Sequence, residues 1–173
     1  MSQAPVSDAI TYGYEPPRNT QFSVFLDNRV GKLLDLVQVF HGQQAVLAGL
    51  SVVDATDHAV VRLLTSRADL SRRLLERHRL PFSEAEILAV ELGRGKTLAE
   101  LCRTLLGAEL NIYYAYPLLI QPRGLPVIAL HTDDLLLSAQ LLRRKLFTLL
   151  AENDLGDNAS RGTEGNPNYP TPE

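Results

Sequence analysis

The sequence of 173 residues lacks several features that would place it in a specialised class of protein. Its single cysteine, Cys102, rules out an internal disulfide and fits a reducing compartment. Its net charge of −3 provides no basic excess for a broad nucleic-acid surface. Charged residues interrupt every apolar run before it could span a bilayer. What remains, 45% hydrophobic and 21% charged residues, is the composition of a soluble globular protein.

Targeting and catalytic patterns are missing as well. The N-terminal residues show no basic segment followed by an apolar one, so we expect no secretory signal and a cytoplasmic protein. The histidines lie far apart and have no ligand spacing to Cys102, so we expect no metal. No nucleophile–base pair or complete phosphate loop is present. The sequence therefore predicts a protein that is not an enzyme and has no cofactor.

A change of hydrophobic period marks the stretch around which the chain is organised. Residues 22–27 alternate as in a strand, and from Leu33 to Phe40 apolar residues recur with a helical period. A polar turn at residues 27–31 joins the two, and the N–H groups at the following helix start suit an anion. An alternative stays open, in which Asp27 or Asn28 only caps the helix. The predicted buried face of this helix consists of Leu33, Leu36, Val37 and Phe40.

The next residues continue in alternating strands and helices. Gly42 supplies a helix stop, and strands are predicted over residues 46–53 and 58–65. A second helix runs from Asp69 to Pro81, and a fourth strand covers residues 82–90. The resulting order, βαββαβ, is the ferredoxin-like plan.

The same pattern then recurs at an offset of 65 residues, which predicts a duplication. Matching pairs include Gly42 with Gly107, Asp69 with Asp134, and Phe82 with Phe147. Cys102 matches Val37 and is expected to lie in the core. The repeat predicts strands over 87–92, 112–120, 125–131 and 146–152, and helices over 97–106 and 134–145.

We therefore predict an α+β fold of two tandem ferredoxin-like βαββαβ units, with antiparallel sheets and helices on one face. The units cover residues 20–86 and 87–154, between a flexible N-terminal arm (1–19) and a disordered tail (155–173). Each sheet keeps one bare face, so the two units should pair and a homodimer is expected beyond that pairing. Residues on the bare faces include Leu47, Gly49, Tyr114 and Tyr116.

At residues 25–33 the strand, Asp27-Asn28, Gly31 and Leu33 resemble the strand-to-helix signature of ACT domains. The resemblance covers about residues 21–154 and is stronger in the first unit. It implies a regulatory, allosteric module that binds an amino acid or similar small molecule at an interface formed by this loop and a neighbouring strand.

Carried over by position, the resemblance places a ligand between two segments of the first unit. The ligand carboxylate would meet N–H groups at the helix start, and its ammonium would meet Asp27 or Asn28. In the second unit Leu92 replaces Asp27 and Lys96 replaces Gly31, so we expect no equivalent site there. The implied ligand-binding residues are Asp27, Asn28, Val30, Gly31, Lys32 and Leu33 in the loop, and Gly49, Leu50 and Ser51 in the second strand.

The sequence bears on three other interpretations. Residues 93–97 suggest a phosphate loop, but Val90 stands where that motif needs a glycine. RNA binding is disfavoured because the aromatic motif of such domains is missing. A ligand-free interaction module that pairs with an enzyme of amino-acid metabolism stays open as the alternative function.

Overall fold

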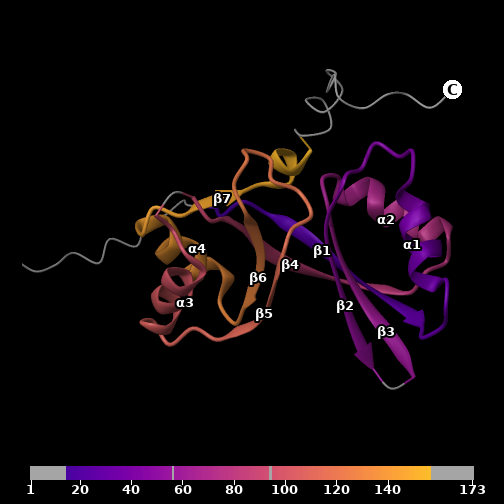
Figure 1. The fold of residues 1–173 in the computed structure, drawn as a ribbon, viewed down its shortest axis with the longest axis horizontal. Helices are drawn as coiled ribbons and strands as arrows, with labels where there is room; N and C mark the ends of the chain where they lie inside the picture. Colours follow the sequence, from indigo (N-terminus) through magenta and orange to yellow (C-terminus); the bar gives the residue numbers. More distant parts are fainter. Residues whose placement is uncertain (1–14, 56, 94, 157–173) are drawn as a thin grey trace, which may run out of the picture.

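The computed structural model describes residues 15–55, 57–93 and 95–156 (Figure 1). The first unit contains β1 (Asn19–Asp27), α1 (Lys32–Phe40), β2 (Leu47–Ala55), β3 (His58–Thr65), α2 (Ala68–Arg77) and β4 (Phe82–Glu91). The second contains α3 (Leu98–Leu106), β5 (Ile112–Pro117), β6 (Val127–Thr132), α4 (Leu135–Arg144), β7 (Thr148–Leu150) and a short 3-10 helix (Glu152–Leu155). No helix in the described part of the chain is long and apolar enough to cross a membrane.

One strand, β4, belongs to both units. Its residues 82–87 pair with β1, its residues 88–91 pair with β6, and its residues 89–91 also pair with β7. All of these pairs are antiparallel, and the strand order is β2-β3-β1-β4-β6-β5 with β7 also on β4. The sequence predicted two overlapping strands, over 82–90 and 87–92, and the structure replaces them with a single continuous one. The units therefore join without a linker.

The predicted α+β fold of two ferredoxin-like units is confirmed. In each unit two helices cover one sheet face, and α1 with α2 and α3 with α4 lie on opposite outer sides of the molecule (Figure 1). The two inner sheet faces pack against each other, so the predicted pairing of bare faces is also confirmed. This inner core consists of Ala48, Leu64, Ile87, Ala89, Tyr116, Val127, Ala129, Leu150 and Leu155. Leu47 was wrongly predicted on a bare face, since it packs on the side covered by α1 and α2.

The duplication is present, but a single offset of 65 is wrong for its second half. Buried Leu36 in α1 corresponds to Leu101 in α3, 65 residues later. After the second strand the offset becomes 67 (132 − 65), because the Thr65–Ser71 hydroxyl pair recurs as Thr132–Ser138. The turn between β5 and β6 is longer than that between β2 and β3. Consequently Phe147 corresponds to Leu80 and not to Phe82. The N–H of Leu80 donates to the carbonyl of Leu75 just after α2, as the N–H of Phe147 donates to the carbonyl of Leu142 after α4.

The predicted inward face of α1 is correct only in part. Leu36 and Phe40 are buried together with Val39, whereas Leu33 and Val37 are 40% and 36% exposed. The apolar stripe of this helix is wider than its contact with the sheet, so part of it faces solvent. The prediction that Cys102 lies in the core is wrong for the same reason, since its thiol is exposed on α3.

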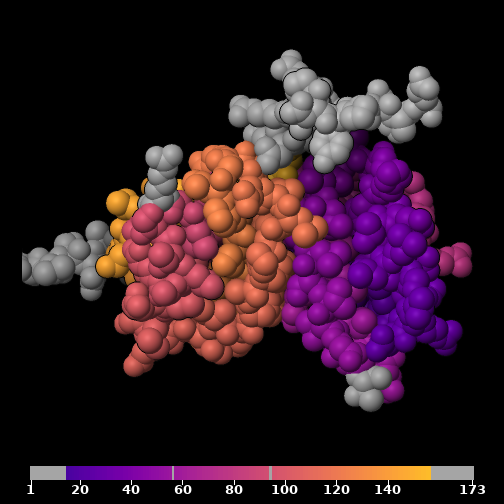
Figure 2. All heavy atoms as spheres, in the orientation of Figure 1, coloured from indigo at the N-terminus to yellow at the C-terminus, as the bar shows by residue number. Residues whose placement is uncertain are grey.

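The atoms of the two units meet along a continuous seam on the face shown in Figure 2. The end of the described chain contributes to this contact, because Leu155 is fully buried in the inner core. The proposed arm and tail fall mostly at residues 1–14 and 157–173, outside the described residues.

Candidate functional site

The loop between β1 and α1 forms an open turn. Gly31 adopts a left-handed conformation (φ 91°) as the residue before the helix, a conformation that favours glycine. Apart from Gly31 itself and its two chain neighbours, no described residue has an atom within 4 Å of the position that a Cβ at Gly31 would occupy. The adjacent Val30 side chain is fully exposed. The backbone of this loop is therefore accessible from solvent.

No described side chain accepts a hydrogen bond from the N-terminus of α1, whereas the N-terminus of each of the other three α-helices in the described part of the chain has such an acceptor. Thr97 caps α3 and Asp134 caps α4 with their own side chains. The carboxylate of Glu152 accepts a hydrogen bond from the N–H of Ala68 at the start of α2. A free helix N-terminus carries unpaired N–H groups and a partial positive charge, which favour an anion.

Polar groups of the loop lie beside the far end of β2. The Asn28 amide donates to the Asp54 carboxylate at 2.9 Å, and Lys32 forms an ion pair with Asp35 at 3.3 Å. Asp27 ends β1 with an exposed side chain. The carboxylates of Asp27 and Asp54 thus lie on the elements that flank the start of α1. They are acceptors for a cation, and the N–H groups of the helix start are donors for an anion.

The three predicted ligand-binding residues of β2 lie away from this loop in the structure. Gly49 is buried beneath unit 2, where a Cβ would approach Leu118 to 2.6 Å. Leu50 packs in the core under α1, and Ser51 is half-buried on the inner face. These residues precede Asp54 by three to five positions, which is roughly 10–16 Å along a strand. Strand β3 separates them from β1, so one chain does not bring the two predicted segments together.

The corresponding loop of unit 2 uses its polar groups internally. Gly95 takes the left-handed conformation (φ 76°). The Lys96 ammonium lies 2.8 Å from the Glu100 carboxylate and 5.3 Å from the centre of the Phe147 ring. The Thr97 side chain caps α3. The Lys96 ammonium and the N-terminus of α3 therefore already have partners within the chain.

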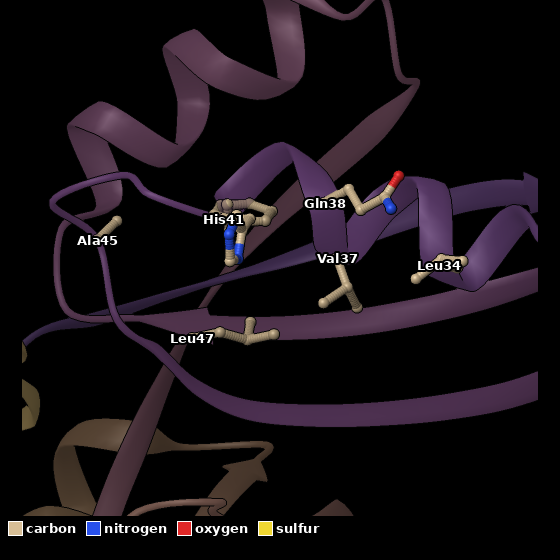
Figure 3. Close-up of a pocket in the computed structure, with 7 residues that line it drawn as sticks. Leu34, Val37, Gln38, His41, Ala45 and Leu47 are labelled. Atoms are coloured by element: carbon tan, nitrogen blue, oxygen red, sulfur yellow. The ribbon is translucent and has the colours of Figure 1, made fainter. Parts of the chain in front are cut away.

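Sequence reasoning missed an apolar groove beside α1 (Figure 3). It has a volume of about 440 Å³ and lies between the exposed side of α1 and the segment that leads into β2. The sequence feature that could have indicated this groove is the apolar stripe of α1, which is wider than the contact of the helix with the sheet. The lining residues are Leu34, Val37, Gln38, Phe40, His41, Ala45 and Leu47.

A buried polar cluster at the junction of the units was also missed. The Tyr116 hydroxyl donates to the Gln21 side-chain oxygen at 2.8 Å, and the Gln21 amide donates to the Tyr114 hydroxyl at 2.8 Å. Burial is the main cause that raises the pKa of Tyr116 well above its ordinary value, with the neighbouring Tyr114 adding to it. Gln21 in a strand of unit 1 therefore holds two tyrosines of unit 2.

The described residues contain no group of three or more His, Cys, Asp or Glu side chains that could hold a metal ion. Residues 18–158 match the family described as an ACT domain pair. No curated protein sequence matches the chain significantly.

Two solved structures share the fold. A protein from Bacteroides thetaiotaomicron superposes with a TM-score of 0.71 at 20% identity, covering 80% of this chain and 96% of that one. The ligand-free regulatory subunit of aspartate kinase from Thermus thermophilus superposes with a TM-score of 0.52 at 8% identity, covering 75% and 93%. At such identities these likenesses concern the fold alone.

Proposed function

Because the chain belongs to the ACT domain pair family, we propose that it is a non-catalytic regulatory protein that binds an amino acid at the loop between β1 and α1. The observation that carries this proposal is the uncapped N-terminus of α1 beside Gly31. A carboxylate there would complete the helix start as Glu152, Thr97 and Asp134 complete the other three.

The second charge of an amino acid has acceptors within the same loop. The Asp27 carboxylate is exposed, and the Asn28–Asp54 pair holds a further carboxylate beside it. An ammonium group would form charge-assisted hydrogen bonds with these oxygens. The loop of unit 2 supports no second site in this proposal, since its lysine and its helix cap already have partners.

We further propose that a second copy of the chain completes the site. Strand β2 lies at the edge of the strand order. Its outer side is bonded to unit 2 at Ala48 and Gly49, and the part of the edge that follows is where another strand could pair. The exposed apolar side chains of α1 beside that edge, Leu34 and Val37, would become buried in such a contact. Residues 50 and 51 of one copy would then approach the loop of the other.

A thermal-shift screen against the proteinogenic amino acids tests the function. A ligand that binds the folded state should raise the melting temperature of the native chain. Gly31→Arg should abolish that rise by blocking the loop. Gly42→Arg is the matched control, because Gly42 also has positive φ and open surroundings but lies at the other end of α1. If no amino acid raises the melting temperature, the ligand-binding role is refuted and the interaction-module alternative is favoured.

A further inference from the structure

A row of three serines and one arginine crosses the inner sheet face of unit 1. Ser51 on β2, Arg62 on β3, Ser23 on β1 and Ser83 on β4 are direct neighbours in the strand register. Directly opposed residues of antiparallel strands share a face and lie about 5 Å apart. We call this set the serine–arginine row.

Within the part of the chain that the structure describes, Arg62 is a half-buried cation without an acidic partner. It takes part in none of the ion pairs found among the described residues. Its guanidinium carbon lies 3.9 Å from the centre of the Tyr114 ring. Stacking occupies the face of the guanidinium and leaves its N–H edge for hydrogen bonds. A partly desolvated charge of this kind is stabilised by an anion.

The row lies where unit 2 stops covering the inner face. On one side the neighbouring row, which includes Gly49 and Leu64, is buried under Tyr116 and Leu118. In Figure 1, β2 and β3 continue past this junction and diverge from β5. The face there consists of Val53, Val60 and Phe25, which are again direct neighbours across three strands.

These three residues form a partly exposed apolar surface beside the cation. Phe25 is 38% exposed and Val53 is 39% exposed. A charged donor, flanked by hydroxyls and followed by an apolar surface, matches a ligand with an anionic head and an apolar body.

We propose that the serine–arginine row binds a small organic anion. Its oxyanion head meets the Arg62 guanidinium and the hydroxyls of Ser23 and Ser51, and its apolar body lies on Phe25, Val53 and Val60. This site is on the sheet face opposite α1. It is therefore separate from the loop at residues 27–31. Ser51 also belongs to the proposed contact between two copies, but the serine–arginine row is formed within one chain and does not rest on the function proposed for that loop.

The test uses benzoate as the probe and benzamide as its uncharged analogue of similar shape. Binding to the full chain is followed by ¹H–¹⁵N correlation NMR. Benzoate should shift the Arg62 side-chain Nε–H signal and the backbone amides of Ser23 and Ser51, and benzamide should not. Arg62→Gln should weaken benzoate binding about 10- to 100-fold, the expected loss of charge-assisted hydrogen bonds.

Three controls keep the result specific. Arg73→Gln removes the same charge from an exposed position on α2 and should leave benzoate affinity unchanged. Asn28→Ala alters the loop and should also leave it unchanged. Arg62→Lys keeps the positive charge but replaces the planar guanidinium, with its paired N–H donors, by an ammonium group, so this variant should bind benzoate more weakly than the native chain. It provides the test if Arg62→Gln does not fold.

Several outcomes would overturn the proposal. One is the absence of benzoate-induced shifts at the row. Another is equal affinity of Arg62→Gln, or of Arg62→Lys, and the native chain. Equally tight binding of inorganic sulfate and benzoate would refute the assignment of an organic ligand with an apolar body.

Discussion

The hydrogen bond between Tyr116 and Gln21 should make the two units a single cooperative structure. Gln21 is fully buried and Tyr116 is 6% exposed. Replacing Tyr116 by Phe leaves the Gln21 oxygen without its donor in a place that water does not reach. The free energy of unfolding should fall by about 1–3 kcal/mol, the cost of an unsatisfied buried polar group.

Replacing Gln21 by Met should cost about 1–3 kcal/mol as well, because the buried Tyr116 hydroxyl then loses its acceptor. In the Gln21→Met background, Tyr116→Phe should cost almost nothing, since neither partner remains to be left unpaired. The two substitutions should therefore show a coupling energy of about 1 kcal/mol or more.

Urea unfolding followed by circular dichroism measures all four members of this cycle. Tyr113→Phe is the matched control, because Tyr113 is 59% exposed, and it should change stability by less than about 0.5 kcal/mol. Each variant should unfold in one transition, since β4 and the inner core belong to both units. Additive costs, or separate transitions for the two units, would refute this reasoning.

Three further predictions concern packing, charge and capping. Gly49→Val should destabilise the chain by about 1–3 kcal/mol through collision with unit 2, whereas Gly93→Val, with no atom within 4 Å, should have little effect in thermal melts. A hydrogen bond from Arg72 lowers the pKa of Glu84, so the stability this pair gives above pH about 4.5 should be lost as the pH falls through the lowered value. Because the pair is about one-third exposed, the loss should not exceed about 1 kcal/mol, and Glu84→Gln should remove this pH dependence in acid unfolding curves. Glu152→Gln removes the negative charge at the start of α2, so the free energy of unfolding should fall by about 0.3–1 kcal/mol and the melting temperature should fall with it. An unchanged melting curve would contradict that role.

The number and order of the elements could be predicted from the sequence because each follows from a local period. Strand β3 occupies the predicted residues 58–65, and α1 begins one residue before its predicted start. The sharing of β4 could not be predicted in this way. Residues 82–91 form one extended run that suits the last strand of one unit and the first strand of the next, and only pairing decides that it serves both.

The candidate site was predictable to a similar extent. The left-handed Gly31 and the exposed turn follow from local chemistry, and the structure has both. The burial of Gly49 depends on contact with Leu118, which is 69 positions away, so no local pattern could indicate it. The orientation of α1 likewise depends on how far its apolar stripe extends beyond the sheet, which left Leu33 and Val37 partly exposed.

Calorimetric titration of an amino acid identified by the thermal screen tests the central claim most directly. Asn28→Ala should weaken binding by about 1–3 kcal/mol if its side chain meets the ligand, and Lys96→Ala, the matched position in unit 2, should change it little. If Lys96→Ala abolishes binding while Asn28→Ala leaves it intact, the site belongs to the second unit and the assignment to the β1–α1 loop is wrong.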